Sequence, residues 1–309
     1  MLGKHPTNVF YVQNEVEGLM TQVVAFVVSA RPRQWSKNLV VLSALLFALE
    51  FRDGGSVLAA VGATLLYTAV SGGHYVLNDA VDVSLDRQHP IKRNRPIAAG
   101  RLSVPIAVWT AVFVILTATS LAFLLAWPLG VSLTAYVLLQ TMYTLWLKHM
   151  VVLDLLAISI GFVVRAAGGA LAISVAISPW LYICTFLLAL FLAVSKRWAE
   201  LVGRPSAQNA RPVLSTYTPE FLRTLIVITV ASTFLSYTLY TFSAPNLPAN
   251  HSMMLTIPIV LYGLLRYLYL VQVRGVGDAP ERLLLEDRGI LAANVLWVVM
   301  SGAILQFAG

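Results

Sequence analysis

Long apolar stretches separated by short polar segments dominate the chain. A helix that crosses a bilayer needs roughly 17 to 25 mostly apolar residues. This criterion predicts about nine spans, at residues 37–51, 56–77, 104–126, 129–147, 150–173, 178–195, 219–243, 252–272 and 289–307. The shorter apolar run 20–30 ends at Arg31-Pro32-Arg33 and is typical of a helix that lies in the membrane interface. With no repeat or linker in the pattern, we expect one all-α membrane domain over residues 1–309.

Composition excludes an ordinary soluble enzyme. Of the 309 residues, 58% are hydrophobic and only 11% are charged, whereas soluble domains carry about 25% charged residues. The single cysteine, Cys184, excludes a disulfide framework and argues against a structural zinc site. Residues 1–17 are polar, include two glutamates and do not resemble a cleavable signal.

Basic residues follow every second predicted span. They occur before span one and after spans two, four, six and eight, whereas the opposite loops hold only Arg52. The positive-inside rule therefore predicts a cytoplasmic N-terminus and an outward C-terminus, which requires an odd number of spans and agrees with nine. This distribution also explains the formal net charge of +7 without a nucleic-acid partner, for which no binding motif is present.

The densest polar motif stands where the second span ends. Asn78, Asp79, Asp82 and Asp86 have helical spacing and can share one stripe. Neighbouring carboxylates repel one another unless cations intervene, and an all-oxygen ligand set suits Mg²⁺ with substrate phosphate oxygens. The alternative is a solvated helix end compensated by Arg87 and the basic residues after it. The chain has few acidic residues elsewhere, and this motif lies next to the bilayer. Both observations favour a functional site.

The loop that follows these acids is strongly basic. Lys92, Arg93 and Arg95 lie between two prolines, Pro90 and Pro96, which stiffen the backbone. Because arginine forks match phosphate groups, we expect this loop to bind phosphate. Binding of anionic lipid head groups is the alternative.

Three further polar clusters lie at the ends of spans. The first is Tyr143, Lys148, Asp154 and Arg165, and the second is Lys196 and Arg197 with Glu200. The third comprises Arg33, Gln34, Lys37 and Asn38, before the first span. The structural alternatives are buried ion pairs, snorkelling helix ends and interface anchoring. The Lys37-Asn38 pair fits a head-group phosphate site better than anchoring alone.

The acidic motif resembles the first signature of the UbiA superfamily of intramembrane prenyltransferases, N-D-x-x-D-x-x-x-D. The resemblance covers nearly the whole chain and implies nine transmembrane helices around a central cavity that holds Mg²⁺. A second motif of typical members, D-x-x-x-D, is not matched at Asp154, because Ile158 stands four residues later. This departure weakens the assignment to an aromatic prenyltransferase.

One branch of the superfamily, whose members transfer phosphoribosyl groups to polyprenyl phosphates, is more similar. The resemblance lies in the blocks 31–38, 78–100, 147–166 and 196–201, with a weaker one at 280–288. It implies that phosphoribosyl pyrophosphate donates to a polyprenyl (decaprenyl-type) phosphate for cell-wall arabinan synthesis. It also implies a multi-pass protein of the bacterial cytoplasmic membrane, in contact with membrane lipids, with a cytoplasmic active site and a homotrimeric assembly.

The resemblance also implies roles for the candidate residues. Asn78, Asp79, Asp82 and Asp86 would hold the metal. The donor phosphates would meet Arg93, Arg95, Tyr143, Lys148, Arg165, Lys196 and Arg197. The lipid phosphate would meet Arg33, Gln34, Lys37 and Asn38, and catalysis would rest on Asp79, Asp82, Asp86, Lys148 and Asp154. Segments 1–36, 79–103 and 196–218 would form the interfacial N-terminus and two cytoplasmic cap loops.

Two other functions remain open at this point. An aromatic prenyltransferase would also use a diphosphate leaving group, so the acidic motif does not separate it from the phosphoribosyl branch. The missing second acidic pair and the basic set Lys148, Lys196 and Arg197 favour a sugar-phosphate donor. A transporter would explain charge within the membrane, but not several phosphate-suited blocks on one side.

Overall fold

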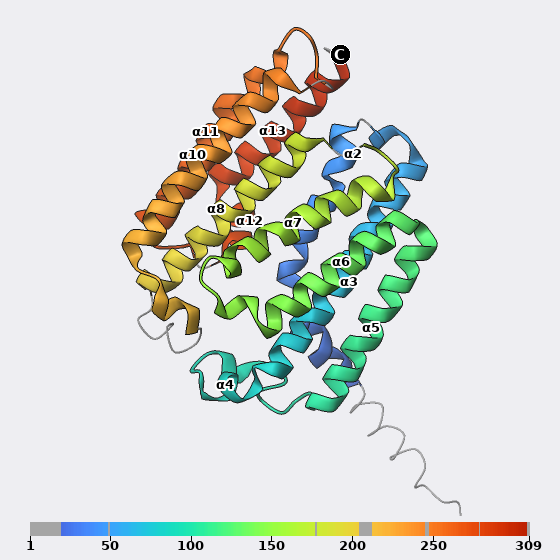
Figure 1. Ribbon diagram of the computed structural model, residues 1–309, viewed down its shortest axis with the longest axis vertical. Helices are drawn as coiled ribbons and strands as arrows, with labels where there is room; N and C mark the ends of the chain where they lie inside the picture. Colours follow the sequence, from blue (N-terminus) through green and yellow to red (C-terminus); the bar gives the residue numbers. More distant parts are fainter. Residues whose placement is uncertain are drawn as a thin grey trace, which may run out of the picture. The chain divides into compact units, whose positions relative to one another are not determined.

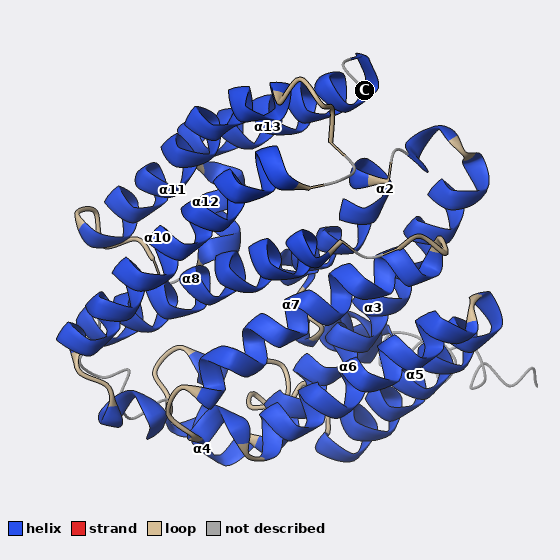
Figure 2. Ribbon diagram, turned by 45° about the horizontal axis from the view of Figure 1, so that its top comes forward, coloured by secondary structure: helices blue, strands red, loops and turns tan. Residues whose placement is uncertain are grey.

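The computed structural model describes residues 20–48, 50–176, 178–203, 212–244, 247–277 and 279–307, and every regular element in these ranges is a helix (Figure 2). The prediction of an all-α fold is therefore confirmed. Parts of two predicted segments, residues 1–19 of the N-terminal segment and 204–211 of the second cap loop, lie outside the described residues.

The helices follow one another with short connections. After an apolar helix at Met20–Ser29 come η1 (Pro32–Leu42), α2 (Ser43–Phe47), η2 (Glu50–Arg52), α3 (Gly54–Val81), α4 (Val83–Gln88), η3 (Lys92–Asn94), α5 (Val104–Leu125), α6 (Trp127–Leu145) and η4 (Leu147–His149). The second half of the chain contains α7 (Leu153–Ala172), α8 (Pro179–Gly203), η5 (Pro212–Thr216), α10 (Pro219–Ser243), η6 (Ser252–Thr256), α11 (Ile257–Gln272), α12 (Pro280–Glu286) and α13 (Arg288–Phe307).

Seven described helices are long and apolar enough to cross a membrane. They are α3, α5, α7, α8, α10, the continuous stretch Ser252–Gln272 and α13. The predicted span 37–51 differs, because it is divided among η1, α2 and η2 rather than forming one α-helix. The predicted span 129–147 corresponds to α6, whose polar residues, among them Gln140, lower its hydropathy. The count of nine and the orientation of the termini stay predictions.

One compact group of elements comprises residues up to Trp35 together with Thr68–Ala118. Its core is built largely of small side chains, among them Ala25, Ala30, Ala80, Ala107 and Ala111. Small residues let helix backbones approach closely in a membrane. The helix Met20–Ser29 and the C-terminal half of α3 share this core, and their packing places Arg31 beside the end of α3.

The second compact group comprises Ser36–Tyr67 and Thr119–Gly309. Here α6, α7, α8 and α10 pack one against the next, and α11 lies beside α13 (Figure 1). Arg266 of α11 donates to both carboxylate oxygens of Asp287, at 3.2 and 2.9 Å, and Asp287 accepts from the backbone of Ile290 at 3.0 Å. These hydrogen bonds lower the pKa of Asp287 and fix the start of α13.

A close approach of two backbones joins η1 to α7 within this group. A Cβ atom added to Gly169 would overlap the carbonyl oxygen of Val41, which is itself fully buried. Only glycine permits this contact, because the obstructing atom belongs to the backbone and cannot rotate away.

We therefore expect Gly169→Ala to lower the free energy of unfolding by about 1 to 3 kcal/mol through overpacking. Gly263→Ala is the matched control, since its added Cβ would meet Ala293 at an ordinary 3.9 Å. Thermal unfolding in detergent measures both variants. Equal melting temperatures for the two would contradict the proposed close approach.

Candidate functional site

The acidic motif lies at the junction of α3 and α4. Backbone N–H groups of Asp82 and Asp86 donate to the carbonyls of Asn78 and Asp82, at 3.0 and 2.9 Å, so the chain keeps a helical path across the junction. Asp79 and Asp86 are buried, at 2% and 1% exposure, while Asn78 and Asp82 are half-buried. The Asn78 amide donates to Asp82 at 3.2 Å.

Arg95 bridges the two buried carboxylates. One guanidinium nitrogen, Nη1, lies 3.0 Å from Asp79 Oδ1 and 2.6 Å from Asp86 Oδ2. Arg31 donates to the same Asp79 oxygen at 2.5 Å, and Lys92 lies 3.9 Å from Asp86. Two carboxylates close to one another are ionised together only when cations balance them. The three cations therefore neutralise the cluster from two segments of the chain.

Arg31 reaches the cluster from an unusual backbone conformation. Its φ angle is +54°, in the left-handed region, and its guanidinium lies 5.0 Å from the centre of the Tyr75 ring. The left-handed residue ends the helix Met20–Ser29 and turns the side chain toward α3. The sequence places Arg31 in the break that ends the interfacial helix, and that break was the available signal for its contact with Asp79.

The basic loop after the motif is held by its own contacts. His89 accepts hydrogen bonds from the backbone N–H groups of Ile91 and Lys92, both at 3.1 Å. Arg87 donates to Ala98 at 3.3 Å and Arg101 donates to Asn94 at 2.6 Å. Arg93, predicted to bind donor phosphate, is exposed. Among the described residues, no three His, Cys, Asp or Glu side chains converge as a preformed metal cage.

Asp154 forms the centre of a buried network in the second group of elements. It is fully buried in the first turn of α7, and its two oxygens accept from Arg197 Nε at 2.9 Å and from the Tyr217 hydroxyl at 2.7 Å. Arg197, only 1% exposed, also donates to Glu200 at 2.9 Å. The predicted donor-site residues Asp154 and Arg197 are thus direct partners.

Tyr217 connects this network to the backbone. Its hydroxyl accepts the N–H of Val152 at 2.7 Å, and Val152 has a φ of +67°, which is strained for a β-branched residue. Burial, together with the hydrogen bond to Asp154, raises the pKa of Tyr217 well above its usual range, so the phenol stays protonated and donates. The sequence offered no signal for Tyr217, because a lone tyrosine has no distinctive spacing.

Arg165 contacts aromatic side chains, and no ion pair joins it to a carboxylate among the described residues. Its guanidinium donates to the Tyr136 hydroxyl and lies 4.7 and 5.0 Å from the ring centres of Tyr136 and Phe162. Its Nε has no hydrogen-bond partner among the described residues although the side chain is buried. Such a cation is stabilised by the aromatic faces and keeps one donor for an anion.

The remaining predicted residues occupy separate positions. Lys148 in η4 and Tyr143 in α6 are half-buried, whereas Arg33 is exposed and Gln34 is half-buried. Asn38 is buried in η1, and Lys37 of the same element lies 3.6 Å from Glu281 of α12. Lys196, half-buried on α8, interacts electrostatically with Lys37 and Glu281.

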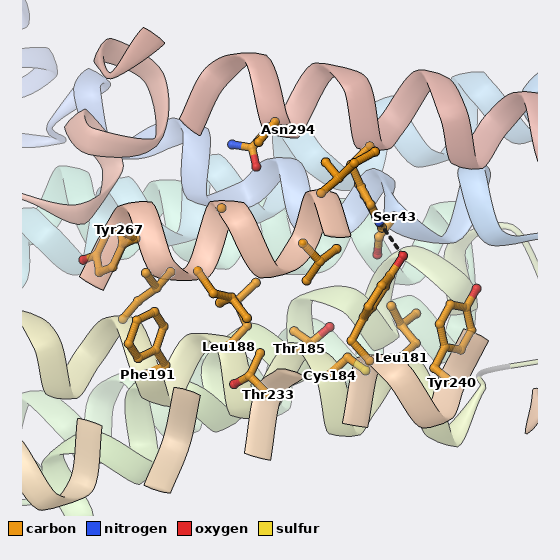
Figure 3. Close-up of a pocket in the computed structure, with 18 of the residues that line it drawn as sticks. Ser43, Leu181, Cys184, Thr185, Leu188, Phe191, Thr233, Tyr240, Tyr267 and Asn294 are labelled. Carbon is orange, nitrogen blue, oxygen red and sulfur yellow. Dashed lines mark hydrogen bonds between the residues drawn. The ribbon is translucent and has the colours of Figure 1, made fainter. Parts of the chain in front are cut away.

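An apolar cavity of about 360 Å³ lies among α2, α8, α10, α11, α12 and α13. Figure 3 shows Tyr267 and Phe191 toward one end of it and Ser43 and Tyr240 toward the other, with Leu188 and Cys184 between them. The lining is mostly aliphatic and aromatic, with a few hydroxyl groups. A cavity of this character is suited to a hydrocarbon chain.

Comparison with known proteins assigns the family. The model of the UbiA prenyltransferase family matches residues 39–285. The chain belongs to this family. The prediction that it is a transferase is thereby confirmed, and its apolar helices are those of a multi-pass membrane protein.

The similar family members include curated enzymes and solved structures. The decaprenyl-phosphate phosphoribosyltransferase of Mycolicibacterium smegmatis is 31% identical over 96% of this chain and 95% of its own length. The enzyme of the same name from Corynebacterium glutamicum is 34% identical over 87% and 82%. A UbiA homologue from Archaeoglobus fulgidus, solved with GPP and Mg²⁺, matches 91% of this chain and 99% of that one with a TM-score of 0.72 at 16% identity. This last likeness confirms the UbiA-like fold.

Removing the bridging cation should destabilise this UbiA family member. Arg95→Ala leaves two buried carboxylates with less neutralising charge, and we expect the free energy of unfolding to fall by about 2 kcal/mol, less than for a fully buried pair because Arg95 is partly exposed. Arg101→Ala, in the same loop but exposed, should change it by less than about 0.5 kcal/mol. Thermal unfolding with EDTA present measures the difference. A loss of stability no larger than that of Arg101→Ala would contradict the bridging role of Arg95.

Proposed function

We propose that the chain is a polyprenyl-phosphate 5-phosphoribosyltransferase. It transfers the 5-phosphoribosyl group of phosphoribosyl pyrophosphate to a polyprenyl, decaprenyl-type phosphate and releases diphosphate, as a step toward cell-wall arabinan. The observation that carries this proposal is similarity along nearly the whole length to curated decaprenyl-phosphate phosphoribosyltransferases. In this proposal the enzyme lies in the bacterial cytoplasmic membrane with its active site on the cytoplasmic side.

The apolar cavity supports a lipid acceptor. Its lining has the chemistry of an isoprenoid chain, and the basic residues Lys37 and Lys196 lie on η1 and α8, two elements of the same compact group. Tyr267 and Leu284 line the cavity, and Leu284 belongs to α12, the helix whose Glu281 contacts Lys37. We assign the cavity to the polyprenyl chain and Lys37 to its phosphate, with Arg33, Gln34 and Asn38 as further candidates.

The acidic motif suits Mg²⁺ by the chemistry of its donors. Carboxylates and one amide are the hard oxygen ligands that this ion prefers, and we assign Asn78, Asp79, Asp82 and Asp86 to it. Arg95 already occupies the position between Asp79 and Asp86, so a metal ion would compete with it for these oxygens. When bound, Mg²⁺ would neutralise the diphosphate of the donor as it leaves.

The chain's own residues would bind and orient the two substrates. We assign the donor phosphates to Arg93, Arg95, Tyr143, Lys148, Arg165, Lys196 and Arg197. The acceptor phosphate is already ionised at neutral pH, so its oxygen can attack ribose C1 without a strong general base. The C1–O bond to diphosphate breaks as the new C1–O bond forms, and direct displacement inverts C1. In this scheme Asp154 holds Arg197 in place, and catalysis consists of positioning and charge stabilisation.

A transfer assay tests this function. Labelled phosphoribosyl pyrophosphate, a polyprenyl monophosphate and Mg²⁺ are incubated with the protein in liposomes, beside geranyl diphosphate with 4-hydroxybenzoate. We expect label in the lipid fraction that is lost with EDTA, and no prenylated aromatic product. Formation of the prenylated aromatic alone would instead support an aromatic prenyltransferase. An α-linked ribose in the product, detected by NMR, would exclude the direct displacement.

A substitution in the acidic motif separates the metal site from the fold. Asp82→Ala should abolish transfer, because it removes a half-buried carboxylate that we assign to the metal ion and that accepts a hydrogen bond from the Asn78 amide at 3.2 Å. The melting temperature should stay near that of the native protein. Asp53→Asn, an exposed acid at the start of the same α3, is the control and should keep full activity. Full activity of Asp82→Ala would refute the assignment.

A further inference from the structure

A carboxylate lies beside Lys37, the cation assigned to the lipid phosphate, and near Lys196, a cation assigned to the donor phosphates. Glu281 is buried in the first turn of α12, at 7% exposure, and its Oε2 atom lies 3.6 Å from Lys37 Nζ. Lys196 interacts electrostatically with both groups. A site built only to attract anions would not need a buried acid, because the acid repels the ligand.

This charged group adjoins one end of the apolar cavity. Leu284, one helical turn after Glu281 on α12, lines the cavity, and so does Tyr267 of α11. Tyr267 is 2% exposed, and its ring packs edge-on against Phe191 with 5.4 Å between centres. Its hydroxyl has no hydrogen-bond partner among the described residues and lies near Glu281. Figure 3 shows this hydroxyl directed away from the middle of the cavity.

These positions give the cavity a polar end of defined charge. Lys37, Lys196 and Glu281 together carry a formal net charge of +1, and the buried Tyr267 hydroxyl adds a neutral donor. A lipid monophosphate brings less negative charge than the corresponding diphosphate. Each additional negative charge near the fixed carboxylate costs Coulomb energy, which is larger in a partly buried site than in water. Repulsion of the wrong ligand is a general route to specificity.

We propose that Glu281 is a specificity-determining residue. It holds Lys37 beside Lys196 at the end of the apolar cavity, and its charge makes the site accept a lipid monophosphate in preference to a lipid diphosphate. The inference rests on the proposed function, since it concerns the acceptor of that reaction. It adds a residue that rejects the diphosphate precursors of the acceptor, which carry the same hydrocarbon chain.

Binding of two short-chain probes tests this role. Calorimetric titrations with farnesyl phosphate and farnesyl diphosphate are run in detergent with EDTA, which removes metal-dependent binding of diphosphate. We expect the native protein to prefer the monophosphate at least about tenfold. Glu281→Gln, which keeps the size of the side chain, should reduce this preference about tenfold or more, chiefly by tighter diphosphate binding. Glu286→Gln, on the exposed face of the same helix, should leave the preference unchanged.

Three results would overturn the proposal. The first is a native protein that binds both probes equally well. The second is a Glu281→Gln protein whose preference for the monophosphate equals that of the Glu286→Gln control. The third is a Glu281→Gln protein that binds both probes more weakly by the same factor. If Glu281→Gln does not fold, Lys37→Met provides the second measurement: both probes should bind at least about tenfold more weakly, and unchanged binding contradicts the site. The transfer assay on native protein is read separately, so label transfer without probe discrimination refutes this inference and leaves the proposed function standing.

Discussion

Pairing of buried charge is the constraint on which the polar part of this protein depends. Four carboxylates are buried in the described part of the chain, and each contacts an arginine or lysine from another segment. Removing an ion from water costs several kcal/mol, and only close, hydrogen-bonded partners offset that cost. In a chain with so few charges, such pairs fix which ends of which helices meet.

The pairs also determine how the cations are presented. Arg197 is held by Asp154 and Glu200, so its guanidinium fork has one orientation. The Tyr217 hydroxyl donates a hydrogen bond to the other oxygen of Asp154. Lys37 is held near Glu281, which stands one helical turn before Leu284, a residue of the apolar cavity lining. A preorganised cation loses less conformational entropy when a phosphate binds than a free surface side chain does. The carboxylates thus stabilise the fold and orient the phosphate-binding groups at the same time.

The sequence could predict the features that have local periodicity. Apolar length located the long helices, and the spacing of Asn78, Asp79, Asp82 and Asp86 placed them together at a helix end. Apolarity was misleading at 37–51, because it does not distinguish one α-helix from successive short 3₁₀ and α segments. Apolarity also placed the end of the predicted span 178–195 before Lys196. The helix α8 instead continues to Gly203, because Arg197 and Glu200 neutralise one another within it.

Contacts between distant segments had no such signal. Nothing in the spacing of Arg95 shows that it bridges Asp79 and Asp86, and the partners Lys37 and Glu281 stand near opposite ends of the chain. The same applies to the partners of Asp154, a residue for which the family resemblance implies a catalytic role. In the structure both of its oxygens are occupied by Arg197 and Tyr217.

The occupation of Asp154 bears on the choice of donor within the family. A carboxylate already bonded through both oxygens has little capacity left for a metal ion. Asp154 and Glu200 together offset the charges of Lys196 and Arg197, so these four residues carry no formal net charge. What they offer a ligand is therefore orientation rather than an excess of positive charge. Under the proposed function, an oriented guanidinium fork would take the place that the unmatched second acidic motif leaves without a metal ion.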